Sequence, residues 1–371
     1  MNRLALHELH QEFGAQFTSV NGAEVVAHYG DAAAELAALR NTVGVLDLSC
    51  RSRLCLTGAD RVKFLHGQVT NDVQRLRVGE GCYAALVSAK GRMHSDLNIY
   101  RLADELLLDF EPGYSPAVIE RLEKFIITDD VQVLDAAPHY GLLTVLGPRA
   151  AEAVTQLGLS WALPERPLAL SAHADATLGQ LYLMRREIAW VPWLARVPDA
   201  TAGEGKSPAP GFDLFVPTAS LGAVFDKLVA AAKSLGGRAC GWQALETTRI
   251  TAGIPRFGQD MDENTLPPEA GLEARAISYS KGCYIGQEVI ARIRTYGQVA
   301  KTLRGLRLPA DLAPLPARGD KLFADGKEVG QLTSVIPGRA LGYVRKDHNA
   351  PGTQLTLRTA AGDCTTTVVQ P

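Results

Sequence analysis

The segment 281–288, with the sequence KGCYIGQE, is the most chemically suggestive short stretch of the chain. It combines an amine at Lys281 and a thiol at Cys283 with two glycines, an amide at Gln287 and a carboxylate at Glu288. Glycine permits positive φ and close approach of a ligand to the backbone. A neighbouring ammonium favours the thiolate form of cysteine, which is the reactive form. The segment therefore predicts either a loop that handles a substrate or a structural turn.

Cys283 is the thiol that this pattern singles out. The alternative is an inert buried residue, because free cysteine is among the most buried residue types. The cysteines are spread along the chain without a CxxC pair, at Cys50, Cys55, Cys82, Cys240, Cys283 and Cys364. This spacing is typical neither of a disulfide framework nor of a zinc knuckle. We therefore predict reduced thiols and no metal site.

The composition indicates a soluble globular protein. The chain has 371 residues, of which 46% are hydrophobic and 21% charged, and its formal net charge is -2. This length favours two or three lobes, and the charge lacks the basic excess of a general nucleic-acid binder. No apolar run approaches the ~20 residues that span a bilayer, and residues 1–10 do not resemble a signal peptide. We expect a cytoplasmic protein with neither nucleic-acid nor membrane partners, and a monomer because no heptad seam is present.

A pattern of strand, tight turn and helix recurs along the chain. Residues 53–65 and 142–154 share their apolar spacing and a central glycine, Gly58 or Gly147. Apolar positions of period two precede each glycine, and a period of 3.6 follows it. A looser copy begins at residue 212. Repeated units of this kind predict related α+β lobes.

Residues between the first two copies predict a lobe of their own, over about 51–133. Strands at 82–88 and 97–102 are expected to form a β-hairpin around a turn that contains glycine. A strand at 105–110 and an amphipathic helix over 116–128 follow.

The flanking regions differ in texture. Residues 31–40 are rich in alanine and predict a helix capped by Asp31, whereas residues 200–210 predict an exposed loop. After about residue 300, short alternating segments punctuated by Gly and Pro predict a small β-barrel or sandwich. Its candidate strands are 302–308, 328–335, 340–344 and 354–357.

A family resemblance is carried by four segments. They are 249–272 (RITAGIPRFGQDMDENTLPPEAGL), 281–288, 64–73 (FLHGQVTNDV) and 90–100 (KGRMHSDLNIY). Together they resemble the YgfZ-type folate-binding family, which is linked to iron–sulfur protein maturation. That family is related to the glycine-cleavage T-protein, an aminomethyltransferase that uses tetrahydrofolate. The resemblance spans most of the chain.

The resemblance implies an α+β fold in which a three-lobed ring surrounds a central folate pocket. Two related α+β lobes and a C-terminal antiparallel β-barrel make up this ring. Residues 1–50 with 139–270 are expected to form the first, discontinuous and folate-binding lobe. Residues 51–138 would form the second lobe, and residues 271–371 the motif loop and the β-barrel domain.

The implied ligand is tetrahydrofolate or a one-carbon derivative. Its flat ring requires apolar or aromatic walls with a few oriented polar groups, and its glutamate tail requires a cation. The candidate binding residues are Tyr83, Asp96, Tyr100, Arg249, Lys281, Gly282, Cys283, Tyr284, Gln287 and Glu288. Structural roles remain open for most of them: half-buried strand tyrosines, an arginine at a helix end or in a salt bridge, and a cap before residues 289–293.

The candidate catalytic residues are Asp96, Lys281 and Cys283. In the T-protein, an aspartate in the region matching Asp96 stabilises cationic charge during one-carbon transfer, although Asp96 could equally be a strand-end carboxylate. The transferases place two adjacent carboxylates before the leucine, whereas this chain has Ser95 before Asp96. Leu245 stands where they carry an arginine, and their Gly-Tyr-Thr-Gly-Glu segment has no counterpart. These departures weaken the case for ordinary aminomethyl transfer.

Three functions follow from these observations. The leading one is a tetrahydrofolate-binding accessory protein that supports assembly or repair of iron–sulfur enzymes through transient contacts with client or assembly proteins. In this reading Cys283 contacts folate, undergoes reversible oxidation or handles sulfur or iron. The second is a folate-dependent aminomethyltransferase or demethylase that uses Asp96 for electrostatic stabilisation. The third is a folate-independent protein-interaction module.

Overall fold

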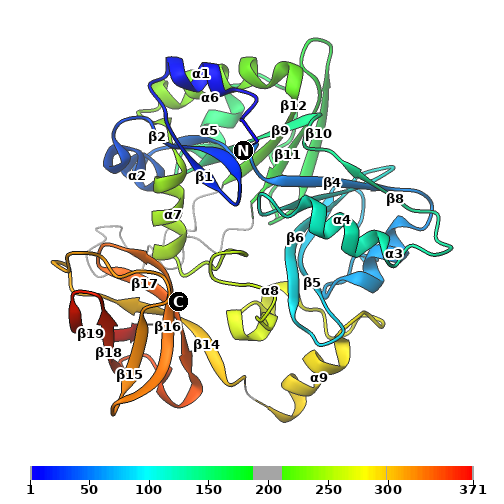
Figure 1. Ribbon diagram of the computed structural model, residues 1–371. Coiled ribbons are helices and arrows are strands. Elements are labelled where there is room, and N and C mark those ends of the chain that lie inside the picture. The colour runs from blue at the N-terminus through cyan, green and yellow to red at the C-terminus, as the bar shows by residue number, and fades with distance from the viewer. Residues whose placement is uncertain (1, 187–210, 298, 370–371) are drawn as a thin grey trace.

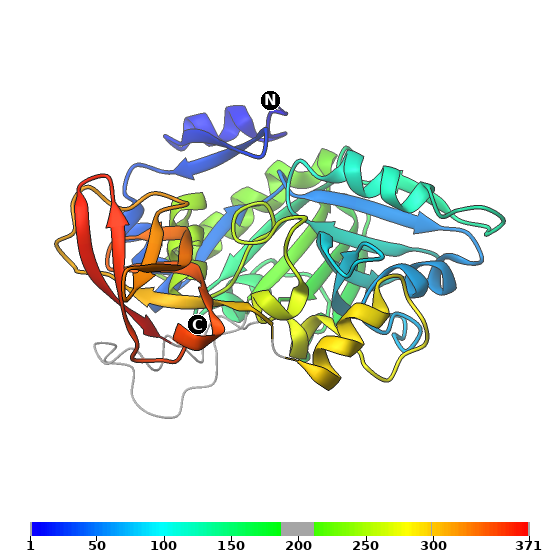
Figure 2. The same ribbon diagram turned by 60° about the horizontal axis from the view of Figure 1, so that its bottom comes forward.

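The computed structural model describes residues 2–186, 211–297 and 299–369, so the loop predicted at 200–210 lies outside the described residues. Two α+β units and a β-barrel are arranged around a common centre (Figures 1 and 2). The α+β fold class and the C-terminal antiparallel barrel are therefore confirmed. No helix in the described part of the chain is long and apolar enough to cross a membrane.

The first sheet has six strands in the order β10-β11-β12-β9-β3-β13. They are β3 (Gly44–Asp47), β9 (Tyr140–Leu146), β10 (Leu170–Asp175), β11 (Gly179–Arg185), β12 (Phe212–Pro217) and β13 (Arg238–Ala239). All pairings are antiparallel except that of β13 with β3. The apolar faces of α5 (Ala150–Thr155) and α6 (Leu221–Ser234) bury one face of this sheet in a closed core.

Further elements surround the first sheet. They are α1 (His7–Glu12), the hairpin β1 (Gln16–Val20) and β2 (Ala23–His28), α2 (Ala32–Asn41), the short η2 (Thr218–Ser220) and α7 (Trp242–Thr251). The predicted cap of α2 is confirmed, because the Asp31 side chain accepts a hydrogen bond from the Ala34 N–H at 2.9 Å.

The second sheet has five antiparallel strands in the order β5-β6-β7-β4-β8. They are β4 (Ser52–Thr57), β5 (Glu80–Val87), β6 (Met93–Arg101), β7 (Leu106–Phe110) and β8 (Gln132–Asp135), with helices α3 (Arg61–Gln68) and α4 (Ser115–Glu123). One face carries a core that includes Leu97 and Ile99, and the opposite face turns toward the centre of the molecule. The predicted β5–β6 hairpin is confirmed.

The strand-turn-helix pattern is present at all three predicted positions, in β4–α3, β9–α5 and β12–α6. Glycine is required at the first of these turns. Gly58 has a φ of +96°, and a Cβ there would lie 2.1 Å from the carbonyl oxygen of Asp130. Helix α4 ends at Glu123, before the predicted residue 128, because its last turn tightens: Phe125 and Ile126 donate to carbonyls three residues earlier.

The C-terminal strands close into a barrel in the order β14-β17-β16-β15-β18-β19. They are β14 (Lys301–Arg307), β15 (Lys321–Ala324), β16 (Lys327–Ile336), β17 (Arg339–Arg345), β18 (Gln354–Thr359) and β19 (Gly362–Val369), with the short η4 (Lys346–His348) between β17 and β18. The segment before the barrel contains η3 (Pro267–Ala270), α8 (Glu273–Ala276) and α9 (Gln287–Tyr296). Of the two predicted alternatives, barrel and sandwich, the barrel is confirmed, because the sheet closes on itself and leaves no free strand edge.

Candidate functional site

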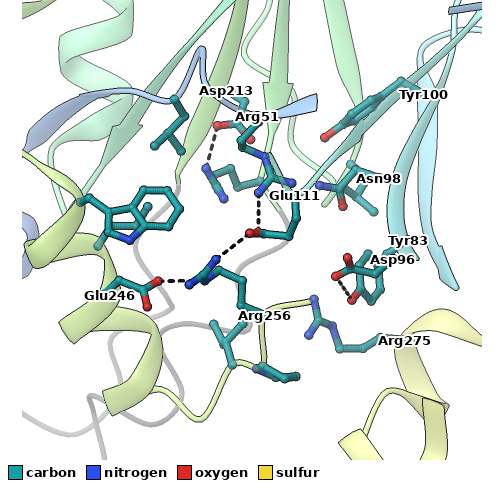
Figure 3. Close-up of a pocket in the computed structure, with 17 residues that line it drawn as sticks. Arg51, Tyr83, Asp96, Asn98, Tyr100, Glu111, Asp213, Glu246, Arg256 and Arg275 are labelled. Carbon is teal, nitrogen blue, oxygen red and sulfur yellow. Dashed lines mark hydrogen bonds and ion pairs between the residues drawn. The ribbon is translucent and has the colours of Figure 1, made fainter. Parts of the chain in front are cut away.

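A pocket lies between the two sheets and the segment that follows α7 (Figure 3). Residues of β5, β6 and β12 line it together with Trp242 and Glu246 of α7. The pocket encloses about 120 Å³. This volume is below the ~300–1,000 Å³ of pockets that enclose a whole drug-sized ligand. A larger ligand would therefore insert one end and leave the remainder outside.

Asp96 is the central polar group of the pocket. Alternate residues of β6, namely Asp96, Asn98 and Tyr100, point into the pocket because successive side chains of a strand face opposite sides (Figure 3). The Tyr83 hydroxyl on β5 donates a hydrogen bond of 2.7 Å to Oδ2 of Asp96. The other oxygen, Oδ1, is buried and has no hydrogen-bond partner among the described residues. Asp96 thus presents one fixed oxygen and one open acceptor.

Burial, with a smaller contribution from the negative charge of Glu111, raises the pKa of Asp96 to about 6. The hydrogen bond from Tyr83 and the charge of Arg51 act in the opposite direction. The carboxylate is therefore ionised at neutral pH and becomes protonated in mildly acidic solution. An ionised acceptor in this place would bind an N–H group or stabilise a nearby cation.

Tyr100 contributes an aromatic wall. It is buried, and its ring meets Phe215 edge to face with centroids 6.3 Å apart. Burial raises the pKa of Tyr100 well above its usual value, so its hydroxyl keeps its proton at physiological pH. The structure therefore brings Tyr83, Asp96 and Tyr100 together in one pocket, although they come from two different strands.

A chain of ion pairs crosses the pocket. Arg51 pairs with Asp109 through Nε and Oδ1 at 2.8 Å and with Glu111 through Nη1 and Oε1 at 2.9 Å. The second oxygen of Glu111 accepts from Nη1 of Arg256 at 3.0 Å. Nε of Arg256 lies 3.3 Å from Oε1 of Glu246 (Figure 3). Alternating charges therefore balance one another around the cavity.

Arg249 is not among the described residues that line the pocket, so its expected role in folate binding stays a prediction. It forms a double hydrogen bond with Glu246, both at 2.6 Å, and an ion pair of 2.7 Å with Asp260. It also donates to the hydroxyl of Ser334 in β16 at 2.9 Å. Arg249 therefore forms salt bridges, as one of the predicted alternatives had it. Its guanidinium contacts groups of α7, of the segment after α7 and of the barrel.

The motif loop 281–288 also lies outside the described lining of the pocket, so a role of Lys281, Gly282, Cys283 and Tyr284 in folate binding stays a prediction. The Lys281 ammonium donates to three carbonyls at the end of α3, those of His66 at 2.5 Å, Val69 at 2.6 Å and Asn71 at 2.9 Å. These contacts hold the loop against the second lobe, at its lower edge in Figure 1.

The individual residues of the loop have different environments. Burial lowers the pKa of Lys281 to about 8, so the ammonium form prevails at neutral pH. Tyr284 is buried, and the centroid of its ring lies 4.8 Å from the Lys281 ammonium. Cys283 is exposed, which contradicts the alternative of an inert buried thiol. Gln287 and Glu288 begin α9, but the N-cap of this helix is Gly286 and no side chain makes a cap hydrogen bond, so the capping alternative is wrong. Glu288 favours the helix as a carboxylate in its first turn.

Sequence reasoning missed several residues of the pocket. Arg256 lies 5.2 Å over the ring of Trp242, and both line the cavity. Arg275 of α8 lies 5.0 Å over the ring of Tyr83. Arg256 falls inside the motif 249–272, which is a signal that could have found it. Trp242 and Arg275 lie outside the motif segments and had no such signal.

The described residues contain no group of three or more His, Cys, Asp or Glu side chains that could hold a metal ion.

Comparison with family models places most of the chain in one family. Residues 6–185 and 207–281 match the GCVT N-terminal domain. Residues 304–371 match the CAF17 C-terminal beta-barrel domain. The two matches coincide with the α+β part and with the barrel.

Individual proteins give the same result. An aminomethyltransferase of Corynebacterium jeikeium is 30% identical over 92% of this chain and 87% of its own length. A chloroplastic protein of Arabidopsis thaliana, named as a transferase, is 30% identical over 87% of this chain and 70% of its own length. The crystal structure of the glycine cleavage system aminomethyltransferase T from Bartonella henselae superposes with a TM-score of 0.83 at 22% identity. That superposition covers 100% of this chain and 97% of the other, and it shows that the fold is shared. The chain therefore belongs to the GCVT family of aminomethyltransferase-like proteins.

Proposed function

We propose that the central pocket binds tetrahydrofolate or a one-carbon derivative, and that the protein thereby supports the assembly or repair of iron–sulfur enzymes. The observation that carries the folate part is the open oxygen of Asp96. A buried acceptor without a partner is unfavourable until a donor reaches it. The edge of a reduced pterin ring carries N–H groups of the required kind.

The other walls of the pocket fit the same ligand. Trp242 and Tyr100 offer the flat surfaces against which a ring packs, and Tyr83 keeps Asp96 in one orientation. The cavity of about 120 Å³ has room for the end of such a molecule. Arg275, which lines the pocket beside Tyr83 (Figure 3), would supply a cation for the glutamate tail.

Bound tetrahydrofolate would supply a carrier for one-carbon groups. The chain itself supplies negative charge at Asp96, which is ionised above about pH 6. In a buried site such a charge stabilises a cation more strongly than it does in water. The balanced ion pairs of Arg51, Glu111 and Arg256 keep the remaining charges of the pocket fixed.

The iron–sulfur part of the proposal is supported by the resemblance of the motif segments to YgfZ-type proteins and by the CAF17-type barrel. In this proposal Cys283 works from the surface rather than from the pocket. Its exposure makes it accessible to a client protein while folate occupies the separate cavity.

Titration of tetrahydrofolate into wild type, Asp96→Asn and Cys283→Ala by calorimetry tests both parts. We expect Asp96→Asn to weaken binding at least about tenfold, since a charge-assisted hydrogen bond contributes about 1.5–3 kcal/mol. Cys283→Ala should bind folate like wild type. In cells that lack the protein, Cys283→Ala should fail to restore the activity of an iron–sulfur enzyme.

The two parts fail separately. If wild type shows no saturable binding of tetrahydrofolate, the folate assignment is wrong. If Cys283→Ala restores the client enzyme fully, the thiol has no role in client support, whatever the folate result.

A second candidate function is aminomethyl transfer, which is favoured by the names of the relatives and by one feature of β6. Ser95, which occupies the position of the missing second carboxylate, faces the core of α3 and α4, away from the pocket. Its identity therefore does not alter the pocket. A tetrahydrofolate-dependent assay with an aminomethyl donor would decide: transfer that is abolished in Asp96→Asn supports this function, and no transfer by wild type excludes it for that donor.

A further inference from the structure

A second cavity lies between the hairpin β1–β2 and the second lobe. It encloses about 550 Å³, which falls within the ~300–1,000 Å³ typical of small-molecule sites. Its wall includes the hairpin tip at Asn21, the segment 49–53 and the loop that leads into α4. The tip and the loop touch: a Cβ on Gly113 would lie 2.3 Å from the carbonyl oxygen of Asn21. Figure 1 shows the hairpin beside this loop.

Arg53 is a buried cation in the wall of this cavity, with 1% of its surface exposed. Its guanidinium donates to the carbonyls of Arg51 at 2.8 Å, Ser49 at 3.0 Å and Ala137 at 3.4 Å. Its Nε has no hydrogen-bond partner among the described residues, and no carboxylate of the described chain forms an ion pair with it. Burial lowers the pKa of Arg53. Neutral carbonyls orient this charge, and the negative charges of Asp109 and Asp47 act on it without forming an ion pair.

Helix α4 begins in the same wall. No side chain caps its N-terminus, its first turn holds no acidic residue, and a proline occupies its start. The N-terminus of a helix carries partial positive charge and favours anions. Ser115, the first residue of α4, lines the cavity and adds a hydroxyl donor there. Two independent features, the helix end and Arg53, therefore create positive potential in one cavity.

Three other charged groups lie in the described part of the wall. Arg51 is balanced by its own carboxylates on the side of the folate pocket, and Arg3 is paired with Glu8 at 2.8 Å. Asp135 is the one carboxylate among the described lining residues, and its Oδ1 accepts a hydrogen bond of 3.0 Å from the Ala137 N–H. We propose that this cavity binds a small organic oxyanion, a phosphate or carboxylate compound, whose charged group lies at the start of α4 beside Arg53.

Calorimetric titration of the full chain with inorganic phosphate, and separately with succinate, tests the proposal at constant ionic strength set by sodium chloride. Wild type should bind at least one of the two saturably. Ser115→Asp places a carboxylate at the start of α4 and should raise the Kd at least tenfold. Ser115→Asn, of the same size as the aspartate but neutral, should stay within about threefold of wild type, since only charge separates the two variants.

Each outcome is decisive. Binding of phosphate alone identifies a phosphoryl ligand, and binding of succinate alone identifies a carboxylate ligand; both support the proposal. Absence of saturable binding of both anions, or equal Kd values in Ser115→Asp and Ser115→Asn, overturns it. Ser115 does not line the folate pocket, so tetrahydrofolate affinity should be the same in both variants and reports that they are folded. Arg53→Gln, if it folds, should weaken anion binding as well.

Discussion

The Tyr83 hydroxyl and Asp96 Oδ2 are 2.7 Å apart, so the carboxylate of the central pocket is held by one oxygen and open at the other. This arrangement fixes the direction from which a ligand donor must approach. It also leaves an ionised group buried without full compensation, which raises the pKa of Asp96 to about 6. A site that is prepared for a ligand in this way is less stable without it.

Asp96→Asn should therefore stabilise the ligand-free protein. The pKa of Asp96 is raised from 3.8 to about 6 in the folded state, so the native protein binds more protons than the unfolded chain between these values. Its stability falls as the pH rises through this window. The shift corresponds to a cost of about 3 kcal/mol at pH 7.5, which declines to about half at pH 5.

Urea unfolding at pH 7.5 and pH 5 measures this difference. The gain in Asp96→Asn should be larger at the higher pH. Tyr83→Phe, which removes the hydroxyl that offsets the shift, should be less stable than wild type at pH 7.5. A gain in Asp96→Asn that does not depend on pH would contradict the assignment of its cause to ionisation.

Ser95→Asp tests which side of β6 the missing second carboxylate would occupy. Ser95 is fully buried on the face that packs against α3 and α4. An aspartate there would be a buried carboxylate without a cation, and its desolvation should lower the free energy of unfolding by roughly 3 kcal/mol or more. Ser95→Ala should cost about 1 kcal/mol, the value of one hydrogen bond. A stable Ser95→Asp variant with increased one-carbon transfer would show that residue 95 faces the pocket.

Local patterns in the sequence were sufficient for much of the fold. The β5–β6 hairpin follows from residues that alternate within one short segment, and the turn at Gly58 requires a positive φ that favours glycine. The same alternation places Asp96 and Tyr100 on one face. Tyr83 joins them because antiparallel pairing sets it diagonally across from Asp96.

The position of the motif loop could not be predicted in the same way. Lys281 is held by carbonyls more than two hundred residues earlier, and nothing in the loop itself specifies that contact. Arg249 and Arg256 lie seven residues apart in one motif, yet only Arg256 reaches the pocket. Which of two arginines faces a cavity depends on tertiary contacts, here those of Arg249 with Asp260 and Ser334.

Lys281→Met should separate the structural role of this residue from a role in ligand binding. The change removes the donor from three carbonyls at the end of α3, and each buried acceptor left without a partner costs about 1–3 kcal/mol. The free energy of unfolding should fall by at least about 2 kcal/mol. Tetrahydrofolate affinity should change less than threefold, because Lys281 lies outside the pocket.

Lys321→Met is the matched control for Lys281→Met. Lys321 forms an exposed pair with Glu328 at 3.1 Å, and such pairs contribute about 0–1 kcal/mol. If Lys281→Met were as stable as this control but had lost folate binding, Lys281 would be a ligand-binding residue after all.

Arg249→Met should loosen the barrel from the rest of the molecule. Arg249 connects α7 with Asp260 and, through Ser334, with β16 of the barrel, and removal of one partner from a buried ion pair costs about 3–5 kcal/mol. Arg358→Met, in an exposed pair within the barrel, should change stability by less than about 1 kcal/mol. Because Glu246 is shared between Arg249 and Arg256, the substitution should also weaken folate binding, whereas the barrel strands should keep their own hydrogen-exchange protection. If exchange instead accelerates throughout the barrel and α7 is unaffected, Arg249 stabilises the barrel fold itself and not its attachment.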